Sequence, residues 1–215
     1  MQTKQQTLAG PISFSGKGLH TGVTVNMTVH PATDNHGIVF RRIDLEDTPS
    51  VPALCEYVTD TSRGTTIEKG TAKVSTIEHI ISALWTMGVD NALIDIDGPE
   101  TPIMDGSARE YVEKIQLTGL VEQKAARKYY EVTEKQVYTI PDKGVAIIIY
   151  PDDEFTVSVH IDFNSKVVGN QYATLDMFNE YKENIAPIAR RSNAFSTPFS
   201  NLMRQGTLKT YSSMR

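Results

Sequence analysis

The sequence predicts an α+β fold, because strand-type and helix-type patterns follow one another along the chain. Residues 23–29 alternate valine and methionine with threonine and asparagine, which is the period of a half-buried strand, and residues 93–97 repeat that period. Between these segments, Ile77, Ile81 and Leu84 recur at the spacing of one helical face. We therefore expect the first half of the chain to contain both strands and amphipathic helices.

Two capping patterns predict where helices begin. Ser75 and Glu78 fit a capping box, in which each side chain bonds the backbone N–H of the other residue. Ser107 and Glu110 fit a second box, which opens a helix that is expected to end near Gly119. Two helices are therefore expected in this part of the chain.

The chain is expected to form two domains and a tail. Residues 1–121 would be the first α+β domain, the charged segment 122–128 a linker, and residues 129–190 a partial second α+β domain. No acidic residue follows Glu183, and residues 191–215 show no sustained hydrophobic period. We expect this tail to lie outside the fold.

Further strands are predicted in the second domain. Residues 145–150 are a continuous apolar run, and residues 155–163 alternate apolar and polar side chains. The turn-forming segment 151–153 lies between them and predicts that they form one hairpin. After them, residues 177–187 place apolar side chains along one helical face.

Length, composition and charge narrow the class of protein. A chain of 215 residues with 40% hydrophobic and 22% charged residues is typical of a globular protein. Its net charge of −5 argues against a nucleic-acid surface, which needs clustered basic residues. No apolar run approaches the ~18–20 residues that cross a bilayer, and the N-terminus has no secretory pattern. Because Cys55 is the only cysteine, an intrachain disulfide is excluded, and we expect a cytoplasmic protein.

Glu78 and His79 are the candidate catalytic residues. A histidine can bind zinc while a neighbouring glutamate takes a proton from metal-bound water, and this pair lies at the start of a predicted helix. The alternative from the residues alone is structural: Glu78 caps the helix and His79 is an ordinary histidine. A catalytic zinc site needs about three protein ligands. The remaining histidines complete no such set in the sequence.

Two glycine-containing segments are predicted to be loops. Residues 16–22 lack the spacing of a phosphate-binding P-loop, so we expect a hairpin corner there. Residues 60–66 are expected to form a second loop, in which the guanidinium of Arg63 is available for an anionic group.

Six motifs occur in order, and together they carry a family resemblance. They are SFSGKGLHTG at 13–22, GIVFRR at 37–42, DTSRGTT at 60–66, VSTIEH at 74–79, DNAL at 90–93 and PIMDGSA at 102–108. From about Gly10 to Arg190 the chain resembles the zinc-dependent UDP-3-O-acyl-N-acetylglucosamine deacetylases of lipid A biosynthesis. Residues 161–163 and 169–171 resemble the branch in which this deacetylase is fused to a 3-hydroxyacyl-acyl-carrier-protein dehydratase.

The resemblance implies a duplicated fold and a specific reaction. Each half would pack two helices on a mostly antiparallel sheet, with the second domain incomplete here and the active site between the halves. His79 would be one zinc ligand, and Glu78 the general base that hydrolyses the N-acetyl group of a UDP-linked, acylated glucosamine. Thr61, Ser62 and Arg63 would bind this substrate. A transient contact with the inner membrane surface is also expected, while the oligomeric state stays open.

The sequence departs from the family pattern after Arg190. The family's two further zinc ligands and its late histidine have no counterpart, and Arg191 stands where the family has an oxyanion-stabilising threonine. We interpret residues 191–215 as family sequence read in a shifted frame, so the 215-residue chain is expected to be inactive by itself. Two alternatives stay open. One is a non-catalytic module that binds the nucleotide sugar or its acyl chain, and the other is a non-functional fragment with an exposed apolar sheet edge.

Overall fold

A five-stranded sheet forms the centre of the structure, a computed structural model that describes residues 2–164, 166, 167, 169–177 and 179–187. The strand order is β2 (Ile12–Lys17), β3 (Thr24–Pro31), β9 (Ala92–Ile96), β4 (Ile38–Arg42) and β5 (Ser50–Pro52). Neighbouring strands are antiparallel except β9 and β4, which run parallel. The predicted α+β class is confirmed, since helices and a mostly antiparallel sheet share one core.

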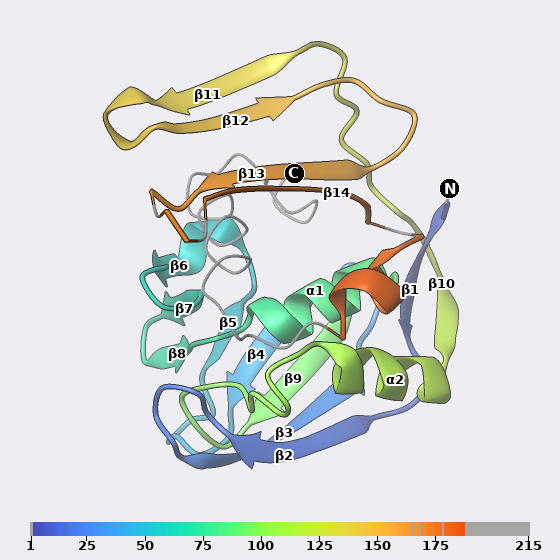
Figure 1. Cartoon of the computed structure of the whole chain (residues 1–215). Coiled ribbons are helices and arrows are strands. Elements are labelled where there is room, and N and C mark those ends of the chain that lie inside the picture. The colour runs from blue at the N-terminus through green and yellow to red at the C-terminus, as the bar shows by residue number, and fades with distance from the viewer. Residues whose placement is uncertain (1, 165, 168, 178, 188–215) are drawn as a thin grey trace.

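Two helices, both predicted, pack on one face of this sheet (Figure 1). They are α1 (Glu78–Thr86) and α2 (Arg109–Thr118). Strand alternation buries Val25, Met27 and Val29 of β3, as expected from the sequence period. The helices bury their apolar stripes in the same cluster: Ile80, Ala83, Leu84, Tyr111, Val112 and Ile115. Neither these helices nor any other helix in the described ranges is long and apolar enough to cross a membrane.

The capping box predicted at the start of α1 does not form. The N-cap of α1 is Ile77 rather than Ser75, and Ser75 Oγ donates instead to the carbonyl of Pro99 (3.2 Å). The positive φ of Thr76 (58°) explains the difference, because it turns the chain between Ser75 and the helix. Glu78 is therefore the first helical residue, and its carboxylate is directed to a partner outside the helix, described below.

The capping box predicted at the start of α2 does not form either, since the N-cap is Ala108 and not Ser107. Ser107 Oγ accepts a hydrogen bond from the backbone N–H of Arg109 (3.1 Å), the first residue of the helix. Glu110 does not complete the box but forms an ion pair with Lys114 one turn later (3.0 Å). The helix ends at Gly119, as predicted, where φ is 78°.

A three-stranded antiparallel sheet lies at one end of the core. It follows β5 and a short 3-10 turn at Cys55–Tyr57, and its strands are β6 (Val58–Asp60), β7 (Thr66–Lys69) and β8 (Ala72–Val74). Residues 61–65 connect β6 to β7, which confirms the loop that was predicted across 60–66.

The first and last strands of the first half pair with each other. β1 (Lys4–Leu8) runs antiparallel to β10 (Leu120–Ala126). The predicted linker at 122–128 was therefore wrong in extent, because residues 122–126 belong to β10. Composition could not show this, since the polar side chains of an edge strand face solvent while its backbone bonds the neighbouring strand. The division into two domains stays a prediction.

The second half contains two separate hairpins rather than the single one predicted between 145–150 and 155–163. The first pairs β11 (Gln136–Ile140) with β12 (Val145–Ile149), and the second pairs β13 (Thr156–Asp162) with β14 (Asn170–Asp176). A 3-10 turn at Pro141–Lys143 precedes Gly144, whose φ of 62° lets β12 fold back on β11. The chain therefore turns back at residues 141–144, and β12 pairs with β11 instead of pairing with β13 across the segment 151–153.

The end of the described chain packs against α1. The helix predicted over 177–187 is shorter than expected, a π-helix at Tyr181–Ile185. The Tyr181 hydroxyl is buried and hydrogen-bonds Ser82 Oγ of α1 at 2.6 Å. Burial raises the pKa of Tyr181 to about 12, so this phenol stays protonated and available for the bond.

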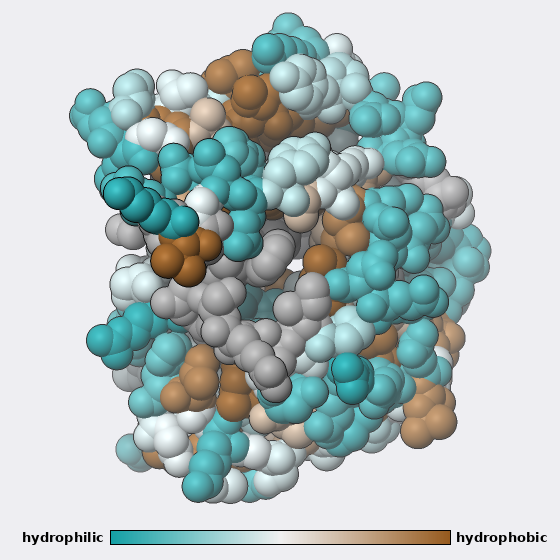
Figure 2. Space-filling model, viewed as in Figure 1, coloured by the Kyte–Doolittle hydropathy of each residue, from teal (hydrophilic) through white to brown (hydrophobic). Residues whose placement is uncertain are grey.

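The β11–β12 hairpin exposes apolar side chains. Val137 is 57% exposed and Ile148 is 45% exposed. The space-filling view shows hydrophobic groups over this hairpin, at the top (Figure 2). Within the described residues, β11 and β12 pair only with each other. This is the kind of surface on which the unstable-fragment alternative depends.

Candidate active site

Glu78 and His79 are the first two residues of α1. Oε2 of Glu78 accepts a hydrogen bond from the backbone N–H of Thr65 (2.9 Å), at the end of the loop between β6 and β7. Gly64 leaves room for the carboxylate, since a Cβ there would lie 3.1 Å from Oε1 of Glu78. The structure thus places the predicted carboxylate against the loop predicted at 60–66.

His79 follows Glu78 in the first turn of the helix, and its Nε2 atom is buried from solvent. The backbone carbonyl of His79 accepts a hydrogen bond from Ser82 Oγ (2.9 Å). Because Ser82 also bonds Tyr181, this turn is tied to the π-helix of the second half. Two parts of the chain therefore hold the backbone of this turn in place.

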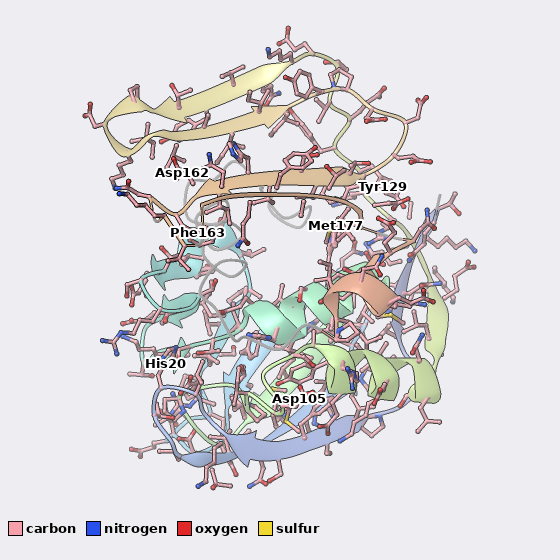
Figure 3. All side chains as sticks on the ribbon, in the orientation of Figure 1. His20, Asp105, Tyr129, Asp162, Phe163 and Met177 are labelled. Carbon is pink, nitrogen blue, oxygen red and sulfur yellow. The ribbon has the colours of Figure 1, made fainter. Side chains whose placement is uncertain are left out.

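The three residues predicted to bind substrate face in two directions. Thr61 is buried, whereas Ser62 and Arg63 are exposed. Asp60 shapes the turn, since its carboxylate accepts hydrogen bonds from the N–H and the hydroxyl of Ser62 (both 3.0 Å). Nε2 of His20 lies 3.2 Å from the Arg63 carbonyl, and Figure 3 shows His20 next to the β6–β8 sheet. Ser62 and Arg63 are therefore the two side chains that a ligand could reach.

The predicted hairpin corner at 16–22 is confirmed, and it lies close to this loop. It connects β2 to β3, and the N–H of Gly18 donates to the carbonyl of Val23 (2.9 Å). His20 is part of this corner, so its contact with Arg63 joins the corner to the β6–β7 loop. The two glycine-containing segments that looked separate in the sequence are neighbours.

Glu100 is a fully buried carboxylate that the sequence reasoning missed. It accepts hydrogen bonds from the N–H of His20 (3.0 and 3.1 Å), the N–H and hydroxyl of Thr21 (2.8 and 2.9 Å), and the hydroxyl of Thr76 (2.8 Å). In the sequence it stands between Pro99 and Thr101, which is typical of an exposed loop. No periodicity could have shown its burial.

The hydrogen bonds to Glu100 also control its ionisation. Burial by itself would raise the pKa of this carboxyl, but the bonds from Thr21, Thr76 and His20 outweigh burial and hold the pKa below its usual value. The carboxylate is therefore charged at neutral pH, and each donor around it bonds a full negative charge.

We expect the free energy of unfolding to fall as the pH is lowered below about 4.3, the usual pKa of a free glutamate. Since the folded pKa of Glu100 is below the unfolded one, its stabilisation is complete above the unfolded pKa and disappears as the pH falls through the folded value. Urea denaturation at neutral and acid pH measures this loss. A Glu100→Gln variant should lose less stability over the same acid range, and an equal loss would contradict the assignment.

The described residues do not contain a complete zinc site. Among them, no group of three or more His, Cys, Asp or Glu side chains could hold a metal ion. His79 supplies one imidazole, where catalytic zinc requires about three protein ligands. Arg191, which was predicted to replace an oxyanion-stabilising threonine, lies outside the described residues.

Comparison with known families agrees with the motifs. Residues 5–214 match the family model for LpxC, UDP-3-O-acyl N-acetylglycosamine deacetylase. The chain belongs to this family. The LpxC match continues past Arg190, where the motifs had predicted that the resemblance would end, so that boundary was wrong. The origin of residues 191–215 in a shifted reading frame stays a prediction.

Several LpxC relatives are similar over most of this chain. It is 47% identical over 183 residues to the bifunctional enzyme LpxC/FabZ of Porphyromonas gingivalis, a match that covers 85% of this chain and 40% of the relative. The LpxC/FabZ enzyme of Bacteroides thetaiotaomicron is 42% identical over 206 residues, or 96% of this chain and 44% of the relative. These names agree with the predicted fused branch of the family.

A third relative is named as the deacetylase alone. It is the UDP-3-O-acyl-N-acetylglucosamine deacetylase of Geotalea uraniireducens, 40% identical over 203 residues, which are 94% of this chain and 65% of the relative. The chain therefore spans less than two thirds of the length of each of these LpxC proteins.

Proposed function

We propose that this chain carries the Glu78–His79 part of an LpxC active site, which hydrolyses the N-acetyl group of a UDP-3-O-acyl-N-acetylglucosamine in lipid A biosynthesis. The observation that carries the proposal is the contact of Glu78 with Thr65, inside a chain that belongs to this family. It brings a carboxylate, an imidazole and the polar 61–65 loop together at the N-terminus of one helix. Positive N-terminal N–H groups also favour an anionic or polarised ligand there.

In the proposed reaction, water adds to the amide carbonyl carbon and the C–N bond then breaks. The products are acetate and the free amine of the sugar. Glu78 would accept a proton from the attacking water and return it to the leaving nitrogen or to solvent. Its bond to the N–H of Thr65 fixes the position of one carboxylate oxygen, Oε2.

We propose further that His79 is a zinc ligand, with the rest of the ligand set outside the described residues. The buried Nε2 atom of this imidazole supports the assignment, because zinc binds neutral histidine nitrogens. By itself one imidazole is a weak site, so we expect the 215-residue chain alone to bind zinc poorly and to release no acetate.

The location follows from the proposed substrate. A UDP-linked sugar is a cytoplasmic metabolite class, and its acyl chain favours a transient contact with the inner membrane surface. We therefore propose a cytoplasmic protein, and Arg63 is the exposed cation of the loop that could meet the diphosphate.

The test is a chimera in which the matched 183 residues of the Porphyromonas gingivalis LpxC/FabZ enzyme are replaced by those of this chain. We expect the chimera to release acetate from the acylated nucleotide sugar, and a Glu78→Gln chimera to be about 10²–10⁴-fold slower. The 215-residue chain alone is the negative control. A folded chimera without activity, or one that is unaffected by Glu78→Gln, would refute the proposal.

The same assay separates the alternatives. If the 215-residue chain binds the nucleotide sugar without added zinc, the binding-module alternative gains support. If the chain is digested early by protease and binds an apolar dye, the exposed Val137 and Ile148 of the β11–β12 hairpin favour the fragment alternative.

A further inference from the structure

We propose that Glu100 is the positioning residue of this site: its buried carboxylate joins three chain segments and thereby holds Glu78 against the 61–65 loop. This inference rests on the proposed function, which makes Glu78 the catalytic base. The positioning of Glu78 by Glu100 can nevertheless be tested without measuring any reaction. Its effect on Glu78 would pass through the segments that it binds.

The first connection runs from Glu100 to the start of α1. Its Oε1 accepts a hydrogen bond from the hydroxyl of Thr76 (2.8 Å), two residues before Glu78. Thr76 is fully buried and has a positive φ of 58°, an unfavourable conformation for a β-branched residue. Thr101, next to Glu100, donates its hydroxyl to the Thr76 carbonyl (2.6 Å). Thr76 is therefore bonded at both its side chain and its backbone.

The second connection runs from Glu100 to the hairpin corner. The backbone N–H groups of His20 and Thr21 and the hydroxyl of Thr21 all point at this carboxylate. Gly18 completes the cradle, because any Cβ at that position would collide with Glu100 and Thr21. The corner is shaped to enclose a carboxylate.

The third connection closes the circuit. Nε2 of His20 contacts the carbonyl of Arg63, two residues before Thr65, and the N–H of Thr65 bonds Glu78. From Glu78 the chain runs back through Thr76 to Glu100. A ring of hydrogen bonds thus surrounds the site, and the Glu100 carboxylate directly bonds both the hairpin corner and the segment before α1.

The charge of Glu100 is essential to this arrangement, because every group around it is a donor. A glutamine has one oxygen and an NH₂ group, and the NH₂ cannot accept from the backbone N–H groups of His20 and Thr21, whereas a threonine hydroxyl can turn to accept from it. Glu100→Gln keeps the shape of the side chain and removes its ability to bond all the donors. It is therefore the sharpest variant for the test.

The experiment is native-state amide hydrogen exchange, followed by NMR on the full 215-residue chain. In Glu100→Gln we expect exchange at the N–H groups of Thr21 and Thr65 to rise by about tenfold or more. Exchange at Val29 and Ile94 in the central sheet should change much less. Thr65 is the decisive amide, because it is bonded to Glu78 and lies far from Glu100 along the circuit.

Asp90→Asn is the matched control. Asp90 also accepts a backbone bond, from the N–H of Gln6 (2.8 Å), and it pairs with Arg127 (2.9 Å). This variant should speed exchange at Gln6 and leave Thr65 unchanged. A purely structural loss in either variant would raise exchange at the sheet amides by the same factor as at the loop.

Two results would overturn the proposal: unchanged exchange at Thr65 in Glu100→Gln, or an equal rise at all amides. If Glu100→Gln does not fold, Thr21→Ala removes one hydroxyl donor and should give the same pattern with a smaller rise. Exchange reports geometry and not turnover. An inactive chimera with the expected exchange pattern would therefore refute the proposed function and leave the role of Glu100 standing.

Discussion

Replacing Tyr111 by alanine is expected to lower the free energy of unfolding by about 3–5 kcal/mol, the usual cost of deleting a buried aromatic ring. Tyr111 of α2 is fully buried and packs on Phe14 of β2, with ring centroids 4.7 Å apart. Its hydroxyl donates to the carbonyl of Pro102. Urea denaturation at neutral pH measures the loss.

Tyr111→Phe separates the ring from the hydroxyl. Burial raises the pKa of Tyr111, so the hydroxyl is protonated and serves as a donor. Without it, the Pro102 carbonyl loses its partner, and we expect a loss of about 1–3 kcal/mol. If phenylalanine costs as much as alanine, ring packing is not what Tyr111 contributes.

Replacing Gly18 by alanine is the second change with a large expected effect, about 3 kcal/mol or more, from overpacking together with lost hydrogen bonds. A Cβ at Gly18 would lie 2.9 Å from Cδ of Glu100 and closer still to Oε2 of Glu100 and Oγ1 of Thr21. These side chains cannot move away easily, because Glu100 is fully buried and bonded by several donors. Denaturation midpoints measure the loss.

Gly10→Ala is the control for this substitution. A Cβ at Gly10 would meet only the methyl group of Thr118, at an ordinary distance of 3.8 Å. We expect a change within about 1 kcal/mol, and a slight stabilisation would be unsurprising because alanine restricts the unfolded chain. Equal losses at Gly10 and Gly18 would show that the Glu100 cradle is not the cause.

The residue pattern was sufficient to predict those helices and strands whose formation depends on residues close together in the sequence. The alternation around Val25, Met27 and Val29 predicted β3, and the spacing of Ile77, Ile81 and Leu84 predicted α1. Such periods reflect which side of an element is buried, so they can be recognised in the amino-acid sequence without a structure. The six ordered motifs likewise led to the family, since short functional segments keep their residue types.

Strand partners were harder, because pairing joins segments that are distant in sequence. The segment 122–126 was expected in a linker but pairs with β1, and the strands β12 and β13 were expected to pair with each other. In both cases backbone hydrogen bonds join the partners, and apart from proline every residue type offers the same backbone N–H and C=O groups. The turn at Gly144 was the local signal that could have corrected the second error.

The sequence by itself determined the fold class, the family, and the choice of Glu78 and His79 as candidate site residues. Only the tertiary structure decided what surrounds them: Thr65 as the donor to Glu78, and Glu100 as the buried centre of the circuit. The physical reason is that a carboxylate's environment depends on which donors converge on it. Those donors come from His20, Thr21 and Thr76, which only the folded chain brings to one point.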